Sequence, residues 1–178
     1  MDIKFRSAMS TDIIRLVGLN HTSNSDYVWQ LDLDKSEGEI NVILREVRLP
    51  RSVQVQYPRN HLSLSDEWRK NAHTLVALSK GAPIAYIRFR EQATAESVWI
   101  IDLVIATEAR KKGVATELIH YVENWAIDRK HRQLFIEMSS KNHPAISLAK
   151  KMGFEFSGYN DHYYATQDVA LFFGKLLK

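Results

Sequence analysis

One stretch in the middle of the chain constrains the fold more than any other: an apolar segment, a basic loop and a helical pattern that begins at a single glycine. The segment Ser97–Ile105 (SVWIIDLVI) is almost unbroken in apolar side chains, which is typical of a strand buried on both faces. After Gly113, apolar side chains recur at helical spacing: Val114, Leu118, Val122 and Trp125. The stretch therefore predicts a buried strand that passes through a short loop into a helix packed on the same sheet.

The junction at Gly113 predicts an anion-binding site. The first amides of a helix have no acceptor within the helix, and the helix dipole places partial positive charge there. A glycine lets the backbone approach a phosphate closely, because no side chain stands in the way. Three cations, Arg110, Lys111 and Lys112, precede the glycine, and Thr116 adds a hydroxyl donor. The alternative is a plain helix start with basic residues nearby, but the dipole disfavours cations at that end unless an anion is bound.

The remaining patterns indicate a mixed α/β protein. With 178 residues, the chain is long enough for one domain with a sizeable core. Before residue 73, strand-like alternation occurs at 3–8, on both sides of a turn at 35–38, and at 52–57 between two prolines, while Ser10 and Trp68 mark short helices. After it, the pattern gives a hairpin over 73–91 with a turn at 81–83 and a strand at 134–138. A helix at 142–152 ended by Gly153 and closing strands at 154–159 and 169–177 complete the pattern.

Composition disfavours several kinds of function. The net charge of +3 is small and the cations are dispersed, which disfavours nucleic-acid binding. The chain has no cysteine, so disulfides, cysteine-ligated metals and a cysteinyl acyl-enzyme are excluded, and no metal is expected. No apolar stretch reaches membrane-spanning length, and the first residues (MDIKFRSAMS) lack the apolar core of a signal peptide. We therefore expect no membrane association and a cytoplasmic location.

Two motifs together resemble the GNAT superfamily of acyl-CoA-dependent N-acetyltransferases. The first is Arg110-x-x-Gly113-x-Ala115, which is similar to the pyrophosphate-binding pattern of that family, while the Walker and dinucleotide glycine patterns are both absent. The second is KNHPAISLAKKMGF, which follows at the expected distance and contains Asn142, Ala145 and Gly153-Phe154. The resemblance extends over roughly 73–178, and within the superfamily the chain is similar to the streptothricin acetyltransferases.

The resemblance implies a fold and a cofactor. The implied fold is a single α/β (α+β) domain with a mixed, mostly antiparallel sheet, a splayed central strand pair and helices on both faces. Residues 73–178 would form the cofactor-binding core, and 1–72 a divergent portion on the acceptor side. Acetyl-CoA would be the acetyl donor, its pantetheine arm bound by the main chain of Leu103, Val104 and Ile105 and by Asn142. Its pyrophosphate would bind the loop and first helical turn: Arg110, Lys111, Lys112, Gly113, Val114, Ala115 and Thr116.

The resemblance defines the catalytic residues less well. The family commonly places a tyrosine four residues after the helix alanine, but that position is Ala149 here, and Ile101 replaces a frequent strand glutamate. Proton transfer is still required, since the amine must lose a proton and the thiolate leaves better when protonated. The candidates are two strand carboxylates as bases and a phenol from the NDHYYA segment: Glu137, Asp102, and Tyr164 or its neighbour Tyr163. The alternative for each is a structural role in a strand or in the core.

These features predict an acetyl-CoA-dependent N-acetyltransferase that transfers acetyl to an amine of a small molecule or peptide, directly within a ternary complex. The alternative is an acyl-CoA-binding sensor or scaffold with little turnover, which the alanine at 149 favours. The acceptor side is marked only by an amino-terminal region that would attract a cationic amine or is a solvated hairpin: Asp26, Asp32, Asp34, Glu37, Glu39, Tyr27 and Trp29. Dimers are frequent in such families, so a homodimer is a further expected assembly.

Overall fold

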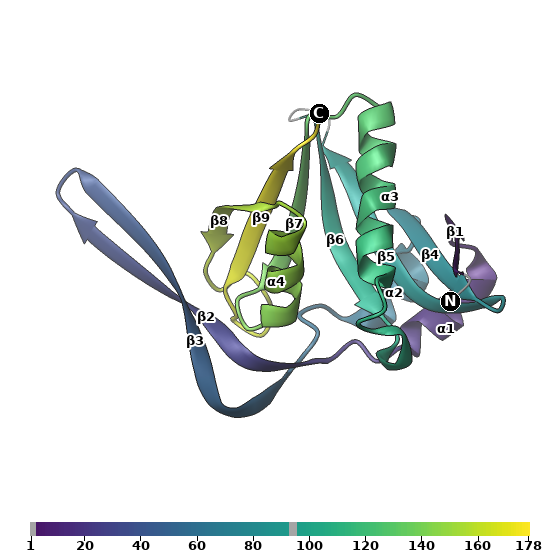
Figure 1. Cartoon of the computed structure of the whole chain (residues 1–178), viewed down its shortest axis with the longest axis horizontal. Helices are drawn as coiled ribbons and strands as arrows, with labels where there is room; N and C mark the ends of the chain where they lie inside the picture. Colours follow the sequence, from purple (N-terminus) through teal and green to yellow (C-terminus); the bar gives the residue numbers. More distant parts are fainter. Residues whose placement is uncertain (1–2, 93–95) are drawn as a thin grey trace.

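A seven-stranded sheet forms the centre of the structure, a computed structural model that describes residues 3–92 and 96–178 (Figure 1). In spatial order, its strands are β1 (Ile3–Ser7), β4 (His73–Ser79), β5 (Ala82–Gln92), β6 (Ser97–Ile105), β7 (Gln133–Ser139), β9 (Ala170–Leu176) and β8 (Glu155–Asn160). Every neighbouring pair is antiparallel except β6 and β7, which run parallel. The predicted mixed, mostly antiparallel sheet is therefore confirmed.

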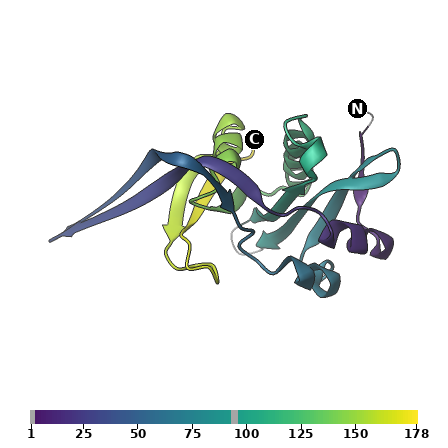
Figure 2. The same ribbon diagram turned by 90° about the horizontal axis from the view of Figure 1, so that it is seen from below.

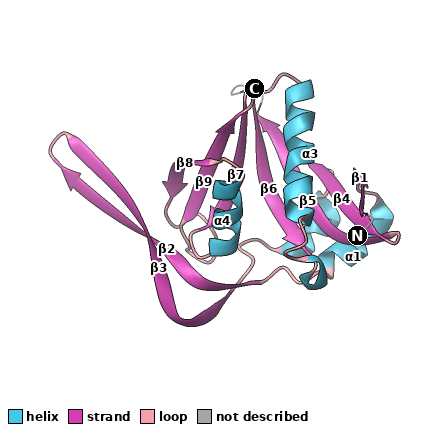
Figure 3. Cartoon of the chain, viewed as in Figure 1, coloured by secondary structure: helices cyan, strands magenta, loops and turns pink. Residues whose placement is uncertain are grey.

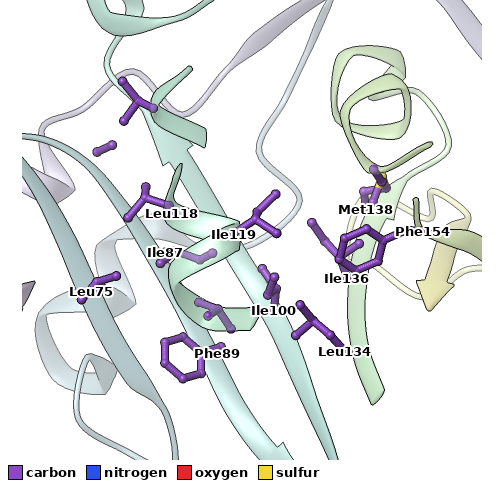
Figure 4. Close-up of a cluster of buried hydrophobic side chains, with 14 of the residues drawn as sticks. Leu75, Ile87, Phe89, Ile100, Leu118, Ile119, Leu134, Ile136, Met138 and Phe154 are labelled. Atoms are coloured by element: carbon purple, nitrogen blue, oxygen red, sulfur yellow. The ribbon is translucent and has the colours of Figure 1, made fainter. Parts of the chain in front are cut away.

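Helices cover both faces of this sheet, as predicted. The helices α3 (Val114–Asp128) and α4 (His143–Lys151) pack on one face, and α1 (Ser10–Val17) and α2 (Leu64–Glu67) lie on the other (Figures 2 and 3). Short 3-10 turns at His61–Ser63 and Thr107–Ala109 join some of the elements. The main core fills the space between the sheet and α3 and α4 (Figure 4), with fully buried side chains that include Ile87, Ile100, Leu118, Ile119 and Leu134.

The strands β6 and β7 separate along their length. Their paired residues run only from Ser97 with Gln133 to Ile100 with Ile136. Beyond that point β6 continues to Ile105 and β7 to Ser139, and the two strands diverge in Figure 1. Among the described residues, the backbone edge of β6 that faces β7 therefore has no ladder partner past Ile100. The two strands form the splayed central pair that the resemblance implied.

A β-bulge at Ile101 changes which side chains of β6 face the main core. On β5, Phe89 pairs with Ile100 while Arg88 pairs with Asp102, so Ile101 is the extra residue. Val98 and Ile100 belong to the main core before the bulge, and Leu103 and Ile105 pack against it after the bulge. Asp102 and Val104 consequently lie on the opposite face. The composition predicted a strand buried on both faces. The strand is not uniformly buried, because buried and half-buried residues alternate along it.

The strands β2 (Ser23–Ser36) and β3 (Glu39–Val55) form a separate two-stranded ribbon that extends away from the sheet (Figure 1). The turn predicted at 35–38 is confirmed, but the segment 52–57 is not a separate strand, because β3 continues through Pro50. Residues 49–52 bulge opposite Asp26, where the ladder is interrupted and proline does not remove a needed hydrogen bond. The base of the ribbon docks beside α4, since the Trp29 amide donates to Ser140 O at 2.9 Å.

One helix cap and one turn differ from prediction. Met9, not Ser10, is the N-cap of α1, because Asp12 accepts a hydrogen bond from the Met9 amide at 2.8 Å. The β4–β5 turn lies at Lys80 and Gly81, whose φ angles of 49° and 79° suit a two-residue hairpin turn. The other predicted helices and strands lie within a few residues of the observed bounds. Within 3–92 and 96–178, no helix is long and apolar enough to cross a membrane.

Candidate active site

The amino-terminal end of α3 has the geometry of an anion site. Gly113 is the N-cap and has a φ of 84°, the left-handed conformation that glycine adopts without strain. The first helical hydrogen bond runs from the Glu117 amide to Gly113 O at 3.1 Å, and no side chain of the described residues caps the helix. The amides of Val114, Ala115 and Thr116 are therefore without a helical acceptor. A Cβ atom added at Gly113 would meet no atom within 4 Å, so open space lies next to this backbone.

Arg110 has a different position from the two lysines that follow it. Its Nε donates to Ile105 O at 3.0 Å and its Nη2 to Asn20 O at 2.7 Å. The guanidinium therefore braces the loop between β6 and α3 with the protein's own carbonyls. Lys111 and Lys112 are exposed, and Lys111 has a left-handed φ of 58°. The lysines, rather than Arg110, provide the freely exposed positive charge beside the helix start.

The other residues predicted to bind the cofactor lie at the end of the sheet where β6 and β7 separate, a region that we call the opening. Leu103, Val104 and Ile105 pair with β5 on one side, and β7 has diverged from them on the other. Asn142 is the N-cap of α4, and its Oδ1 accepts a hydrogen bond from the Ala145 amide at 3.3 Å. Because α3 follows β6 and α4 follows β7, both helix starts lie at the same end of the sheet (Figure 1). The unpaired edge of β6 and the two helix starts thus lie at the same end of the sheet.

Two buried carboxylates lie where the opening begins, one on each strand. Asp102 on β6 is 5% exposed and Glu137 on β7 is 7% exposed. Arg59 connects them: its Nη1 lies 3.2 Å from Asp102 Oδ1 and donates to Ile101 O at 2.6 Å, while its Nη2 pairs with Glu137 Oε1. A side chain thereby bridges the two strands directly beyond their last ladder pair.

Asp102 is held on every side by donors. Arg88 Nη1 lies 3.0 Å from its Oδ2, and the Tyr57 hydroxyl donates to its Oδ1, which Arg59 also contacts. Burial and the nearby Asp102 charge raise the pKa of Tyr57 well above its ordinary value, so the phenol stays protonated. Both oxygens of Asp102 thus accept from an arginine, and the Tyr57 phenol shares one of them.

Glu137 has phenols on its other side. Tyr164 Oη lies 3.4 Å from Glu137 Oε1, and Tyr163 Oη lies 3.4 Å from Oε2. Both tyrosines belong to the loop between β8 and β9, and Tyr164 is 5% exposed whereas Tyr163 is 40% exposed. Burial, followed by the negative charge of Glu137, raises the pKa of Tyr164 far above that of a free phenol. Burial also raises the pKa of Glu137, while the Arg59 charge acts in the opposite direction.

The structure brings the three predicted catalytic candidates, Glu137, Asp102 and Tyr164, into one cluster. It also adds partners that the sequence did not identify. Arg59 follows Pro58 in a loop and gave no signal, whereas Arg88 could have been noticed as the single charge within the apolar run PIAYIRF. Two departures from the family pattern now have locations: Ile101 is the bulged residue, and Ala149 is fully buried in the main core. Within 3–92 and 96–178, no three His, Cys, Asp or Glu side chains are grouped to hold a metal ion.

The acidic amino-terminal region does not form a rim around the opening. Asp34, Glu37 and Glu39 lie on the part of the ribbon that projects away from the sheet (Figure 1), and Asp32 pairs with Arg45 on the neighbouring strand. Only the base of the ribbon approaches α4, where the Tyr27 and His143 rings lie 4.9 Å apart. The solvated-hairpin alternative therefore describes these distal carboxylates better.

A cavity of about 280 Å³ lies elsewhere, lined by aromatic side chains that include Trp68, Phe89, Tyr121 and Trp125. None of its lining residues is a carboxylate, and the helix start at Gly113 is not among them. Catalytic pockets combine convergent polar groups with perturbed pKa values. By that criterion the cluster of Asp102, Glu137 and Tyr164 at the β6–β7 separation, not this cavity, is the candidate active site.

Comparisons with known proteins agree with this geometry. Residues 41–154 match the acetyltransferase (GNAT) family. Streptothricin acetyltransferase of Streptomyces lavendulae is 25% identical over 171 residues, which cover 90% of this chain and 86% of that protein. An L-amino acid N-acetyltransferase of Escherichia coli (strain K12) is 30% identical over 122 residues, which cover 63% of this chain and 72% of that protein.

Solved structures share the whole fold. A nourseothricin acetyltransferase superposes with a TM-score of 0.83 at 20% identity and covers 99% of both chains. A protein of Bacillus anthracis str. Ames, assigned as a streptothricin acetyltransferase and solved in complex with acetyl coenzyme A, has a TM-score of 0.76 at 19% identity, with 98% of this chain and 99% of that chain covered. Because the family match spans more than half of the sequence, the chain belongs to the acetyltransferase (GNAT) family and is an N-acetyltransferase that takes its acetyl group from acetyl-CoA.

Proposed function

We propose that the protein acetylates an amine of a small cationic molecule by direct transfer from acetyl-CoA within a ternary complex. The observation that carries this proposal is the pair of buried carboxylates, Asp102 and Glu137, at the point where β6 and β7 separate. The small-molecule acceptor is supported by the relatives, whose names refer to streptothricin, nourseothricin and L-amino acids. We also propose a cytoplasmic location, because acetyl-CoA is a cytoplasmic metabolite, and 1–72 as the portion that supplies the acceptor side.

We assign acetyl-CoA binding to the unpaired edge of β6 and to the starts of α3 and α4. The main chain of Leu103, Val104 and Ile105 would bind the pantetheine arm, as would Asn142, whose Nδ2 has no hydrogen-bond partner among the described residues. The loop and helix start from Arg110 to Thr116 would bind the pyrophosphate. Helix amides without acceptors and exposed lysines suit a phosphate, and the open space at Gly113 leaves room for one.

For the chemistry, we assign Glu137 as the general base and Tyr164 as the general acid. The lone pair of the amine nitrogen attacks the thioester carbonyl carbon, and the proton of that nitrogen passes to Glu137. When the carbon–sulfur bond breaks, the thiolate takes a proton from the Tyr164 hydroxyl. Burial suits both roles, since it raises the pKa of Glu137 toward the operating range and keeps Tyr164 protonated. Asp102 would hold Arg59 and Arg88 in place.

Replacing Tyr164 with phenylalanine tests the acid assignment. We expect kcat to fall by about 10²-fold, the usual contribution of a positioned acid or base, while the dissociation constant of acetyl-CoA stays unchanged. Initial rates of thiol release and calorimetric titration measure the two quantities. The matched control is Tyr159→Phe, because Tyr159 lies half-buried on β8 against the main core. Equal rates for Tyr164→Phe and the wild type would move the acid role to another group.

An acceptor panel tests the substrate class. Thiol release from acetyl-CoA is measured with streptothricin, with basic and neutral L-amino acids, and with simple monoamines, and each product is identified by mass spectrometry. We expect the cationic acceptors to have the highest kcat/KM. Tight acetyl-CoA binding without thiol release for any amine would favour the sensor alternative, which the buried alanine at 149 first suggested.

A further inference from the structure

Arg59 has no counterpart in the motifs that define the family resemblance, yet its side chain contacts residues of both β6 and β7. It lies in the segment that joins the end of β3 to the turn at His61–Ser63. Pro58 restricts the backbone before it, and Asn60 after it accepts a hydrogen bond from the Leu62 amide at 3.0 Å. The segment is therefore fixed on both sides of Arg59.

The same segment delivers two side chains to β6. Tyr57 and Arg59 are two residues apart, and both contact Asp102 Oδ1. Arg59 alone extends further, to Glu137 on β7. Its guanidinium carbon also lies 5.7 Å from the centre of the Tyr164 ring. Arg59 thus contacts each of the groups that we assign to catalysis.

The planar guanidinium suits this position for a geometric reason. Its donors form a rigid fork, so one side chain can bond two acceptors at a fixed separation. Here Nη1 serves Ile101 O and Asp102 on β6, and Nη2 serves Glu137 on β7. The backbone ladder between β6 and β7 ends at Ile100 and Ile136, and beyond it the Arg59 guanidinium connects the two strands. A lysine could neutralise charge here but could not span both strands in the same way.

From these contacts, and resting on the proposed role of Glu137, we propose that Arg59 is a positioning residue for acetyl transfer. It clamps Glu137 to β6 across the opening and fixes the carboxylate where the acceptor amine loses its proton. Neither the family match nor the relatives assign this role to an arginine in the segment after β3.

The clamp has an electrostatic consequence that experiments can separate from packing. The charged and titratable groups that act on Glu137 come from four segments: Arg59, Asp102, Arg90, Tyr163 and Tyr164. Among them, the positive charge of Arg59 lowers the pKa of Glu137 against the effect of burial. Removing that charge raises the pKa further, so a higher pH is needed before Glu137 can accept a proton. The acid limb of the pH profile of kcat/KM must then move to higher pH.

Two substitutions separate charge from geometry. Arg59→Gln removes the charge but keeps an amide donor, and we expect the acid limb to move upward by about 1 to 3 pH units, the usual effect of one adjacent charge. At a pH that lies on this limb, we expect kcat/KM to fall about tenfold for each unit by which the limb moves. Arg59→Lys keeps the charge but loses the fork, so we expect an unmoved limb with kcat lowered severalfold.

The matched control is Arg6→Gln. Arg6 makes a two-point pair with buried Asp12, with distances of 2.6 and 2.9 Å, and its side chain is 32% exposed, against 31% for Arg59. Its loss should lower the melting temperature without moving the limb. An unmoved limb in Arg59→Gln would overturn the proposal, as would equal limb movement in Arg6→Gln. Should Arg59→Gln not fold, Arg59→Lys decides alone, since full kcat in that variant would overturn the clamp.

Failure of the proposed role of Arg59 can be distinguished from failure of the proposed role of Glu137. If Glu137→Gln kept the full rate, the proposed role of Glu137 would fail and Arg59 would have no base to position. If Glu137→Gln lost the rate while Arg59→Gln kept the wild-type pH profile, only the role of Arg59 would fail. The two sets of variants therefore test the two proposals separately.

Discussion

Replacing Glu137 with glutamine should lower kcat by about 10² to 10⁴-fold, the range expected when a positioned general base is lost. Glutamine has nearly the same shape as glutamate and keeps an oxygen that can accept from Arg59 and Tyr164. It cannot take a proton from the acceptor amine. We therefore expect the rate to fall while the dissociation constant of acetyl-CoA stays within about twofold of the wild type.

The matched control for this substitution is Glu123→Gln. Glu123 on α3 is also a buried carboxylate, 8% exposed, with Lys175 Nζ at 2.6 Å and His120 Nδ1 at 2.8 Å. It lies outside the β6–β7 cluster, so its loss should change stability and leave kcat at the wild-type value. If Glu137→Gln retained the wild-type kcat, a solvent-mediated route of proton transfer would have to replace the assigned base.

Glu137→Gln should not destabilise the fold at neutral pH. The pKa of Glu137 is raised in the folded state, so the folded protein binds its proton more tightly than the unfolded chain does. The free energy of unfolding consequently falls as the pH rises from the unfolded value through the folded one. Above that window, the ionised Glu137 side chain destabilises the folded state, and the residue is kept because the proposed reaction needs a carboxylate. A melting temperature of Glu137→Gln at or above that of the wild type would agree with this account.

Replacing Gly113 with valine should raise the dissociation constant of acetyl-CoA by at least about tenfold, which corresponds to about 1.4 kcal/mol. Two physical effects act together. A β-branched residue does not adopt a φ of 84°, so the loop must change conformation and misplace the amides of the helix start. The new side chain would also occupy the open space beside Gly113 that we assign to the pyrophosphate.

Gly81→Val controls for the conformational effect of this substitution. Gly81 in the β4–β5 turn has a φ of 79°, and an added Cβ atom would likewise meet nothing within 4 Å. The strain is therefore comparable, but the turn belongs to no proposed binding site. Calorimetry should show normal acetyl-CoA affinity for Gly81→Val and weakened affinity for Gly113→Val. Equal affinity in both variants would remove the pyrophosphate from the Gly113 junction.

The local patterns of the sequence predicted most of the fold. The buried strand, the glycine and the helix from 97 to 128 appear almost as predicted, because each depends on neighbouring residues: apolar run, left-handed glycine and helical spacing. The Gly153 helix end is similarly local, with a φ of 82°. Splaying of β6 and β7 has no local signal, and only the resemblance to a family implied it.

The parts that were missed depend on contacts distant in sequence. The bulge at Ile101 places Asp102 on the opposite face of the sheet from the one that strict alternation predicts. An apolar run shows no alternation from which one extra residue could be predicted. Arg59 reaches carboxylates at positions 102 and 137, so its role exists only once three separate segments have come together. The sequence likewise left open whether the acidic ribbon lines the acceptor side or is a solvated hairpin, because the direction of the ribbon is set by the docking of Trp29 beside α4.

Direct transfer within a ternary complex is tested most directly by initial rates of thiol release measured over a matrix of acetyl-CoA and acceptor concentrations, with streptothricin as the acceptor. We predict that release depends on the amine and that the double-reciprocal lines intersect, because a chain without cysteine forms no cysteinyl acyl-enzyme and the amine nitrogen attacks the thioester directly. Parallel lines, or a burst of thiol release before any amine is added, would indicate a covalent acyl-enzyme and contradict the account.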